Sequence, residues 1–349
     1  MVHGPAVSQT PATLKGVPES KLTAPDAPQR PYTRTVHGDA VLDPYHWMAD
    51  KADPELIAYL EAENAYTDQE TAGLDGVTEA IYEELKARTK QTDLSVPTHV
   101  THTDGTSYWY YSRTTEGLDY PRSYRLPATS RDAIPDVTTA PAGEELVLDA
   151  QALAEGHAFF SMGLAQVSPD GRRLAYSLDT SGDERYDLWI TDLATGETLD
   201  GPISGIGAGG AWAGADWIFY TRVDDAWRPH QVWRHHLLGD EPDALVAEEP
   251  DERFWIGVDD SRDHRWVLIE SSSKLTSEVS LLPAADPTAT PRVVADREQG
   301  VDYSVEVAPD GLWILHNAEA PKFALSRAPF SATSPAEWEL VLPEHPRRR

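Results

Sequence analysis

Apolar residues near the start of the chain first recur at helical spacing after residue 50. Asp53 is a good N-cap residue, and Pro54 suits the first position of a helix. The pattern predicts a helix over Asp53–Thr71. Its mostly apolar face is made of Leu56, Tyr59, Leu60, Glu63 and Thr67.

A second helix is expected a few residues later. Val77, Ile81 and Leu85 are spaced by four, which predicts a helix over Thr78–Arg88. The stretch Thr71–Gly76 contains two glycines and an aspartate, so we expect a turn between the two helices.

From Ser95 onward the pattern changes to short β-branched and aromatic runs separated by Gly, Asp and Pro turns. Runs of this length and spacing are typical of an all-β architecture. The clearest predicted strands are Ser107–Arg113, Arg173–Leu178, Asp187–Asp192, Asp216–Arg222, Gln231–His236, Arg265–Ile269, Glu278–Leu282 and Leu312–His316.

The strand-rich region also repeats. One unit opens with Val167–Gly171 (Val-Ser-Pro-Asp-Gly) and closes with Asp192–Gly196. The last three intervals are about 45 residues, and the first is longer, with an insertion near residues 129–160. A repeat of 40–50 residues made of short strands predicts β-propeller blades, here about five. A β-sandwich with coincidental Ser-Pro-Asp-Gly turns is the alternative. Similar units begin at Val100, Ala211, Gly257 and Val307.

The pattern divides the chain into three parts. Residues 1–31 hold six prolines and no periodic apolar pattern, which predicts a disordered Pro/Ala-rich tail. Residues 32–94 form the helical segment, and residues 95–349 form an incomplete β-propeller. The expected fold class is therefore mainly β, a partial propeller preceded by a short α-helical segment.

Charge narrows the classes of partner. The 349 residues carry 29 Lys and Arg against 58 Asp and Glu, a formal net charge of −29. Acids outnumber bases two to one on both sides of residue 97, so the charge belongs to the folded body. Phosphates and anionic lipids require clustered cations, so we expect neither a nucleic-acid nor a membrane partner. A cationic ligand would be attracted, although such a charge often serves only solubility.

Cysteine usage and hydropathy bear on the compartment. The chain has no cysteine, which excludes disulfides and thiolate chemistry and fits a reducing cytoplasm. No apolar run is long enough to span a bilayer, and no secretory signal is visible. We therefore expect a cytoplasmic protein.

Candidate chemistry is sparse. No G-x-S-x-G elbow and no βαβ alternation occur, so a serine nucleophile of the α/β-hydrolase type is not expected in this chain. His99 and His102 on one strand, and the adjacent His235 and His236, point to opposite faces and make poor metal sites. The glycine-rich run Ser204–Gly210 has the composition of a connection between blades. We predict no catalytic residue, no metal site and no cofactor.

Adjacent carboxylates are the remaining candidates. Glycosidases use acidic pairs on propellers, but neighbouring residues on a strand face opposite ways, so solvated loops are the simpler interpretation. Some of these carboxylates could line an axial channel and favour cationic peptides. The pairs are Glu144-Glu145, Asp224-Asp225, Glu248-Glu249, Asp251-Glu252 and Asp259-Asp260.

Several motifs, taken in order, resemble the N-terminal half of the prolyl oligopeptidase family of serine peptidases, most of all its oligopeptidase B branch. In the helical segment and the first predicted strand they are Arg34–Asp39 (Arg-Thr-Val-His-Gly-Asp), Asp43–Asp50 (Asp-Pro-Tyr-His-Trp-Met-Ala-Asp), Leu60–Thr67, Lys90–Pro97 and Tyr108–Tyr111. In the repeats they are Leu153–His157, Ser168–Gly171, Asp179–Glu184, Tyr220–Pro229, Asp251–Trp255 and Ser273–Glu278. The resemblance extends from about Arg30 to Glu344.

The resemblance implies a division of labour. Family members join a seven-bladed propeller, which admits only short peptides, to a C-terminal α/β-hydrolase domain on which the N-terminal helices pack. The Ser-Asp-His triad and the acidic residues that select Arg or Lys belong to that second domain. Here about five blades are present, and two blades and the hydrolase domain are absent. No catalytic residue can be carried over.

We therefore expect the substrate-gating propeller portion of an oligopeptidase B-like serine endopeptidase for short, basic peptides, inactive by itself. The shortness fits either a fragmentary or interrupted reading frame or a genuine short protein. In the second case the chain would be a stand-alone propeller that binds proteins. A five-bladed glycosidase would instead need two inward carboxylates close together at the axis.

Overall fold

The computed structural model describes residues 23–345, which separate into two compact units, one on each side of the boundary between Lys90 and Gln91. The predicted tail, residues 1–31, lies mostly outside the described residues. Its described part has no helix or strand, but Arg30 makes ion pairs with Asp53 (3.2 Å) and Glu55, and the Trp47 indole donates to the Pro28 carbonyl at 2.8 Å. Hydrogen bonds therefore attach residues 28–30 to the N-terminal unit.

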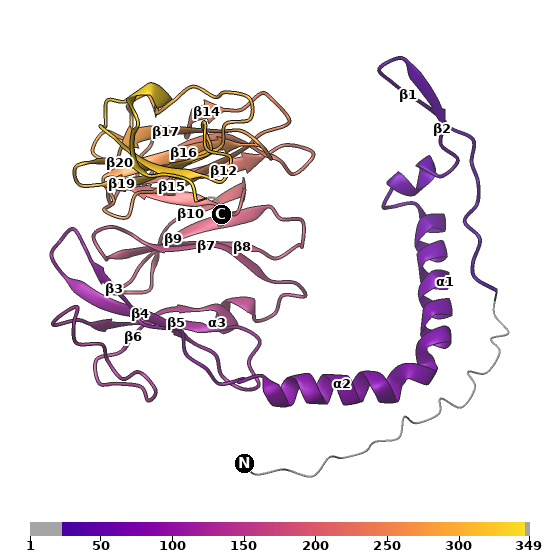
Figure 1. Ribbon diagram of the computed structural model, residues 1–349. Helices are drawn as coiled ribbons and strands as arrows, with labels where there is room; N and C mark the ends of the chain where they lie inside the picture. The colour runs from indigo at the N-terminus through magenta and orange to yellow at the C-terminus, as the bar shows by residue number, and fades with distance from the viewer. Residues whose placement is uncertain (1–22, 346–349) are drawn as a thin grey trace, which may run out of the picture. The chain divides into compact units, whose positions relative to one another are not determined.

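The N-terminal unit contains a small hairpin and two helices (Figure 1). The first helix begins as the sequence predicts, because the Asp53 carboxylate accepts the Glu55 amide at 2.8 Å. The elements are β1 (Thr33–Val36), β2 (Asp39–Leu42), a 3₁₀ turn (His46–Ala49), α1 (Pro54–Thr71), a 3₁₀ turn (Ala72–Leu74) and α2 (Asp75–Arg88).

The second helix starts three residues earlier than predicted. A 3₁₀ turn continues directly from α1, and Asp75 opens α2, where its negative charge favours the helix N-terminus. Gly76 lies in this first turn, where it disturbs the helix less than it would in the interior. The predicted turn over Thr71–Gly76 is therefore largely helical.

The second unit consists of five four-stranded antiparallel sheets, each built from strands that are neighbours in sequence (Figure 1). These are the predicted blades, and all eight predicted strands are present. Five separate sheets exclude the sandwich alternative. Blade 1 has β3 (Thr98–Thr101), β4 (Ser107–Arg113), β5 (Arg122–Pro127) and β6 (Glu145–Asp149), followed by α3 (Ala150–Ala154). Blade 2 has β7 (Ser161–Val167), β8 (Arg173–Asp179), β9 (Tyr186–Asp192) and β10 (Thr198–Ile206). Blade 3 has β11 (Gly210–Ala213), β12 (Trp217–Val223), β13 (Pro229–His236) and β14 (Ala244–Glu248). Blade 4 has β15 (Trp255–Asp260), β16 (Trp266–Ser272), β17 (Ser277–Pro283) and β18 (Arg292–Val293). Blade 5 has β19 (Tyr303–Ala308), β20 (Gly311–His316), β21 (Ala324–Ala328), a 3₁₀ turn (Pro335–Glu337) and β22 (Glu339–Leu342).

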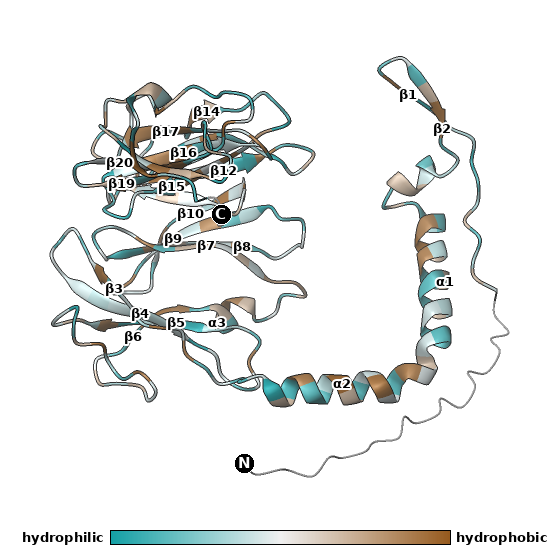
Figure 2. Ribbon diagram, in the orientation of Figure 1, coloured by the Kyte–Doolittle hydropathy of each residue, from teal (hydrophilic) through white to brown (hydrophobic). Residues whose placement is uncertain are grey.

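Apolar seams join successive blades, and Figure 2 shows apolar residues concentrated in their strands. Leu188 of blade 2 packs with Trp212 and Ile218 of blade 3, all three fully buried. Similar clusters join blade 3 to blade 4 and blade 4 to blade 5. In the last of these, the Tyr303 hydroxyl donates to the Ala295 carbonyl at 2.7 Å and accepts the Val279 amide at 2.9 Å. Burial raises the pKa of Tyr303 to about 12.

The seam between blades 1 and 2 is smaller. Its buried cluster contains only Ala150, Ala154, Phe160 and Leu178. Nearer the first strands, Thr98 of blade 1 and Ala165 and Leu174 of blade 2 line a space that side chains do not fill. This seam therefore leaves room for a cavity.

The outer faces of the terminal blades differ. On blade 1, the insertion between β5 and β6 covers the sheet, with Val137 buried and Glu144 bound to Tyr111 and Arg113. The corresponding face of blade 5 exposes Leu315 and Leu342, at 46% and 62%. In the described residues, no other segment of the propeller covers these leucines.

Candidate functional site: two cavities along the first strands

The first strands of the blades converge on a common axis. Gln166, at the end of β7 in blade 2, donates to Asp260 at the end of β15 in blade 4 at 3.3 Å. These residues are 94 positions apart and belong to blades that are not successive. Two cavities lie along these strands.

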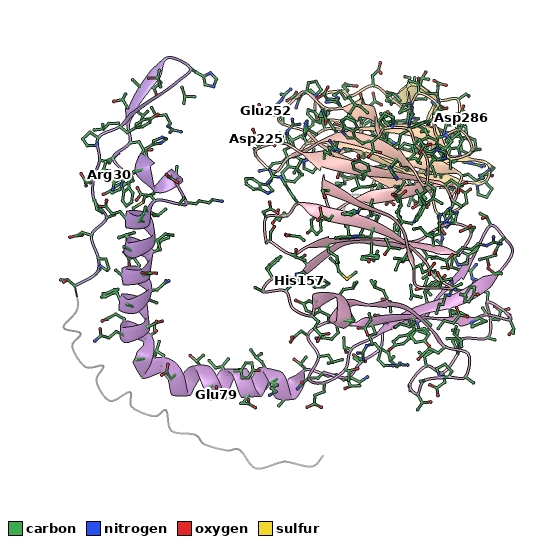
Figure 3. All side chains as sticks on the ribbon, turned by 180° about the vertical axis from the view of Figure 1, so that it is seen from behind. Arg30, Glu79, His157, Asp225, Glu252 and Asp286 are labelled. Atoms are coloured by element: carbon green, nitrogen blue, oxygen red, sulfur yellow. The ribbon has the colours of Figure 1, made fainter. Side chains whose placement is uncertain are left out.

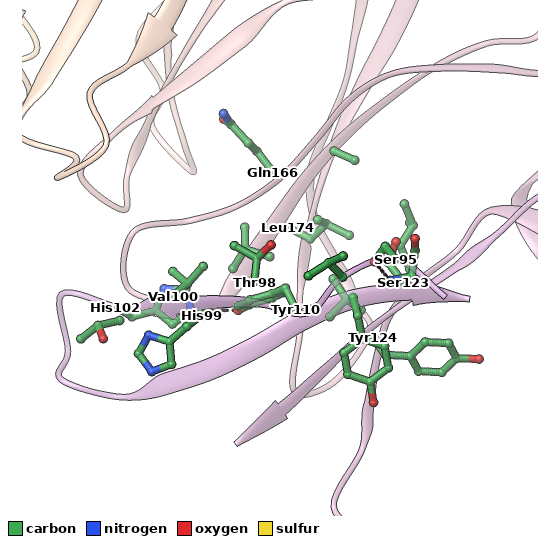
Figure 4. A pocket seen from close by; sticks show the side chains of 18 of the residues that line it. Ser95, Thr98, His99, Val100, His102, Tyr110, Ser123, Tyr124, Gln166 and Leu174 are labelled. Carbon is green, nitrogen blue, oxygen red and sulfur yellow. Dashed lines mark hydrogen bonds between the residues drawn. The ribbon is translucent and has the colours of Figure 1, made fainter. Parts of the chain in front are cut away.

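The first cavity, of about 820 Å³, lies between blades 1 and 2 and reaches the β15–β16 turn of blade 4. Ligand sites commonly have this size. In Figure 4, His99 and His102 lie towards one end and Ser95 and Ser123 towards the other, with Tyr110 between them.

His102 is a fixed part of the wall. Its Nε2 atom is 2.8 Å from the Tyr110 hydroxyl, and its ring also packs against Gly171 of the Ser-Pro-Asp-Gly turn. A Cβ at Gly171 would lie 2.7 Å from the His102 ring, and φ there is +75°. Burial lowers the pKa of His102, so the ring is neutral near pH 7.

Two further side chains come from the axis. The Nδ1 atom of His264 bonds the Asp260 carboxylate, which raises the pKa of His264 despite burial. Gln166 bonds the other Asp260 oxygen, and its own Oε1 has no hydrogen-bond partner among the described residues. Arg131 and Arg262 also line this cavity.

The second cavity, of about 880 Å³, lies between blades 4 and 5. Four carboxylates line it, Asp259 and Asp260 at the end of β15, Glu270 on β16 and Glu306 on β19. Arg262 lines both cavities. A concave surface lined by negatively charged carboxylates attracts cations.

The two histidines of each pair have different partners, although His99 and His102 both line the first cavity. His99 packs edge-on against Trp109, away from the bond between His102 and Tyr110. His236 stacks on Trp217, whereas His235 bridges two carboxylates, Asp243 at 2.7 Å and Asp200 at 3.0 Å. Burial lowers the pKa of His235, but Asp243 and Asp200 together outweigh burial and raise it above 6.5. His235 thus joins the outer strand of blade 2 to blade 3.

The acidic pairs also separate into different roles. Glu144 binds Arg113, and Glu145 binds Arg125. Asp224 binds Arg228. Figure 3 labels its neighbour Asp225 close to Glu252, on the same side of the propeller. Buried Glu249 accepts from Arg297 at 2.6 Å and from Ser271, whereas Glu248 accepts from Gln231 at the surface. Asp251 binds Arg253. Of the five pairs, only Asp259-Asp260 reaches a cavity along the first strands.

Within residues 23–345, no group of three or more His, Asp and Glu side chains is arranged to hold a metal ion. The glycine-rich run Ser204–Gly210 forms the end of β10, the link to β11 and the first residue of β11, with a Cβ at Gly207 excluded by Thr221. Sequence reasoning missed Arg131, Arg262 and Gln166, since no motif marks them.

The fold and the cavities define the class of this domain, a set of propeller blades with concave sites near the axis. Comparison with known proteins specifies the family. The model described as "Prolyl oligopeptidase, N-terminal beta-propeller domain" matches residues 25–349, so the chain belongs to the prolyl oligopeptidase family. The family is one of peptidases, which argues against the glycosidase alternative.

Relatives agree with this assignment. Protease 2 of Moraxella lacunata is 37% identical over 90% of this chain and 44% of its own length. Dipeptidyl aminopeptidase BI of Pseudoxanthomonas mexicana is 35% identical over 92% of this chain and 45% of its own. Oligopeptidase B from Leishmania major superposes with a TM-score of 0.81 at 28% identity, over 93% of this chain and 46% of its own. The chain thus spans somewhat less than half the length of these relatives.

Proposed function

We propose that this chain is the substrate-gating propeller portion of an oligopeptidase B-like serine endopeptidase that acts on short, basic peptides. Family membership supports the peptidase context. The observation that carries the basic preference is the second cavity, where Glu270, Glu306 and their neighbours form a wall of four carboxylates. A Lys or Arg side chain is the natural occupant of such a wall.

The proposed catalytic partner is an α/β-hydrolase domain that supplies the serine, histidine and aspartate. The serine would attack the peptide carbonyl with histidine as the base, so this chain alone would not cleave peptides. The helices supply a second support. Val77, Ile81 and Leu85 form an apolar stripe on α2 that no other element of the N-terminal unit covers. We propose that residues 32–94 pack this stripe on the hydrolase domain.

We also propose a cytoplasmic location, supported by the lack of cysteine. None of the helices in the described residues is long and apolar enough to cross a membrane. The net charge of −29 disfavours nucleic acid and anionic membranes as partners.

Peptide binding tests the proposed preference. Titration calorimetry on the purified chain would compare short peptides that differ only in one Arg, Gln or Glu. We expect the Arg peptide to bind most tightly, and we expect Glu306→Gln to weaken the affinity for this peptide about threefold. Asp240→Asn is the matched control, because Asp240 is exposed on the β13–β14 loop and outside the cavity. Equal binding of all three peptides would contradict the preference.

A cleavage assay tests the division of labour. The chain alone should leave Arg- and Lys-containing peptides intact, and cleavage with contaminating protease excluded would contradict the proposal. A stand-alone protein-binding propeller is the second candidate, favoured by the exposed Leu315 and Leu342 of blade 5. A stable monomer with a cooperative melt would support that candidate, and insoluble or oligomeric material would support a portion of a larger enzyme.

A further inference from the structure

The first cavity has an unusual lining for this protein. Asp and Glu account for 58 of the 349 residues, yet none of the residues that line the cavity between blades 1 and 2 is acidic. Arg131, Arg262 and three histidines do line it. The second cavity has four carboxylates, so the two cavities are of opposite character.

The two arginines are also exceptional in having no partner. Among the Arg and Lys residues of the described part of the propeller, most bind a carboxylate, a carbonyl or a hydroxyl. Three make no hydrogen bond or ion pair, namely Arg131, Arg262 and Lys274. Two of these three line the first cavity. Because the guanidinium fork matches a carboxylate, unpaired arginines beside a cavity are suited to an external carboxylate.

Three acids near the cavity are already bound by other side chains. Asp260 is bound by His264 and Gln166, Asp104 lies 3.8 Å from Arg172, and Glu145 binds Arg125 at 2.7 Å. These contacts reduce the repulsion that an incoming anion would meet. His102 is neutral and His264 is paired with Asp260, so the unpaired positive charge of the wall comes from the two arginines.

The wall also contains a hydrogen-bond acceptor that a peptide can use and a simple anion cannot. Oε1 of Gln166 is a hydrogen-bond acceptor without a partner, and a peptide N–H next to the carboxylate would supply a donor. A phosphate or sulfate has no such donor near pH 7. An acceptor in the same cavity wall as two cations therefore favours a peptide carboxylate.

We propose that the cavity between blades 1 and 2 binds the carboxylate of a short peptide through Arg131 and Arg262. The peptide as ligand rests on the proposed function, whereas carboxylate binding itself does not require hydrolysis. Together with the acidic cavity between blades 4 and 5, this gives the axis one site for each charge of a zwitterionic peptide. Arg262, which lines both cavities, stands between them.

The test is titration calorimetry on the full chain with a tripeptide as the free acid and as its C-terminal amide. The free acid should bind at least about tenfold more tightly, since a charge-assisted hydrogen bond is lost in the amide. Arg131→Gln and Arg262→Gln should each weaken the free acid about threefold to tenfold and leave the amide unchanged. Lys274→Gln removes one unpaired charge outside the cavity and should change neither affinity.

Two further ligands distinguish the sources of the carboxylate. A tripeptide amide with one internal Glu tests whether a side-chain carboxylate suffices, and binding of either carboxylate form supports the proposal. Inorganic phosphate that binds as tightly as the free acid would overturn it, as would equal affinity of acid and amide. Equal losses in Lys274→Gln and the arginine variants would show a long-range charge effect and overturn it too. Thermal melts of each variant confirm that it folds.

Failure of the proposed function gives a different result. If the chain showed no preference for Arg over Gln and Glu peptides, the acidic cavity would lose its assigned role. The difference in affinity between the free acid and the amide would still depend only on Arg131 and Arg262. The two proposals are therefore tested separately.

Discussion

Arg228 fastens blade 3 to the loop that leads into blade 4, and its removal gives a measurable prediction. Its Nη1 atom donates to the carbonyls of Glu249, Asp251 and Phe254 at 3.1, 3.4 and 3.0 Å, and its Nε donates to Asp224 at 3.0 Å. The side chain is only 10% exposed. Figure 3 marks the two loops concerned by Asp225 and Glu252.

Arg228→Met keeps most of the apolar stem and removes all four hydrogen bonds. Each hydrogen bond to a charged group is worth about 1.5–3 kcal/mol, but Asp224 stays 27% exposed and the carbonyls regain some water. We therefore expect a net loss of about 3 kcal/mol in the free energy of unfolding. In a domain of this size that corresponds to a fall in Tm of about 6–12 °C.

Thermal and urea unfolding followed by circular dichroism measure this loss. Arg253→Met is the matched control, because Arg253 belongs to the same loop but its side chain is 72% exposed. We expect the control to change stability by less than about 0.5 kcal/mol. A Tm for Arg228→Met within about 2 °C of the parent value would refute the reasoning, because such a shift corresponds to a loss of less than about 1 kcal/mol in the free energy of unfolding. So would equal losses in both variants.

Three other predictions concern the seams and the cavity wall. The protonated His235 ring stabilises the fold fully below its unfolded-state pKa near 6.5, and this stabilisation is lost as pH rises through the higher folded-state pKa. His235→Gln should therefore flatten the pH dependence of Tm above pH 6.5, whereas the control variant His236→Gln should not. Tyr303→Phe should cost about 1–3 kcal/mol, measured by urea unfolding, because two backbone groups lose their partner. Gly171→Ala should cost more than about 1 kcal/mol and weaken peptide binding, because a Cβ at positive φ meets the His102 ring; unchanged melting and binding would contradict this.

The propeller was predictable because its information is local. Each blade is built from neighbouring strands whose turns and alternation are visible in the sequence, as for Ser107–Arg113, which matches β4 residue for residue. The helices were predictable except at the start of α2. There the glycines of Thr71–Gly76 suggested a break, but a 3₁₀ turn and the Asp75 charge continue the helical path.

The cavities were only partly predictable. Solvated loops were the simpler interpretation of the acidic pairs, with an axial position open for some of them, and Asp259-Asp260 lines the second cavity. The basic character of the first cavity was not, because Arg131 and Arg262 lie on an insertion and on a turn of different blades. Nothing in the local pattern of either residue distinguishes it from a surface arginine, and only the arrangement of blades around the axis places both at one cavity.

The bond between Gln166 and Asp260 has a consequence for how the protein folds. Each blade closes through hairpins of short sequence separation, and such contacts form early and quickly. The link from β7 to β15 joins residues 94 positions apart, so it must wait until the intervening blade 3 is in place. The walls of the first cavity are therefore complete only once blades 1, 2 and 4 are assembled, and ligand binding there would report on that assembly rather than on any single blade.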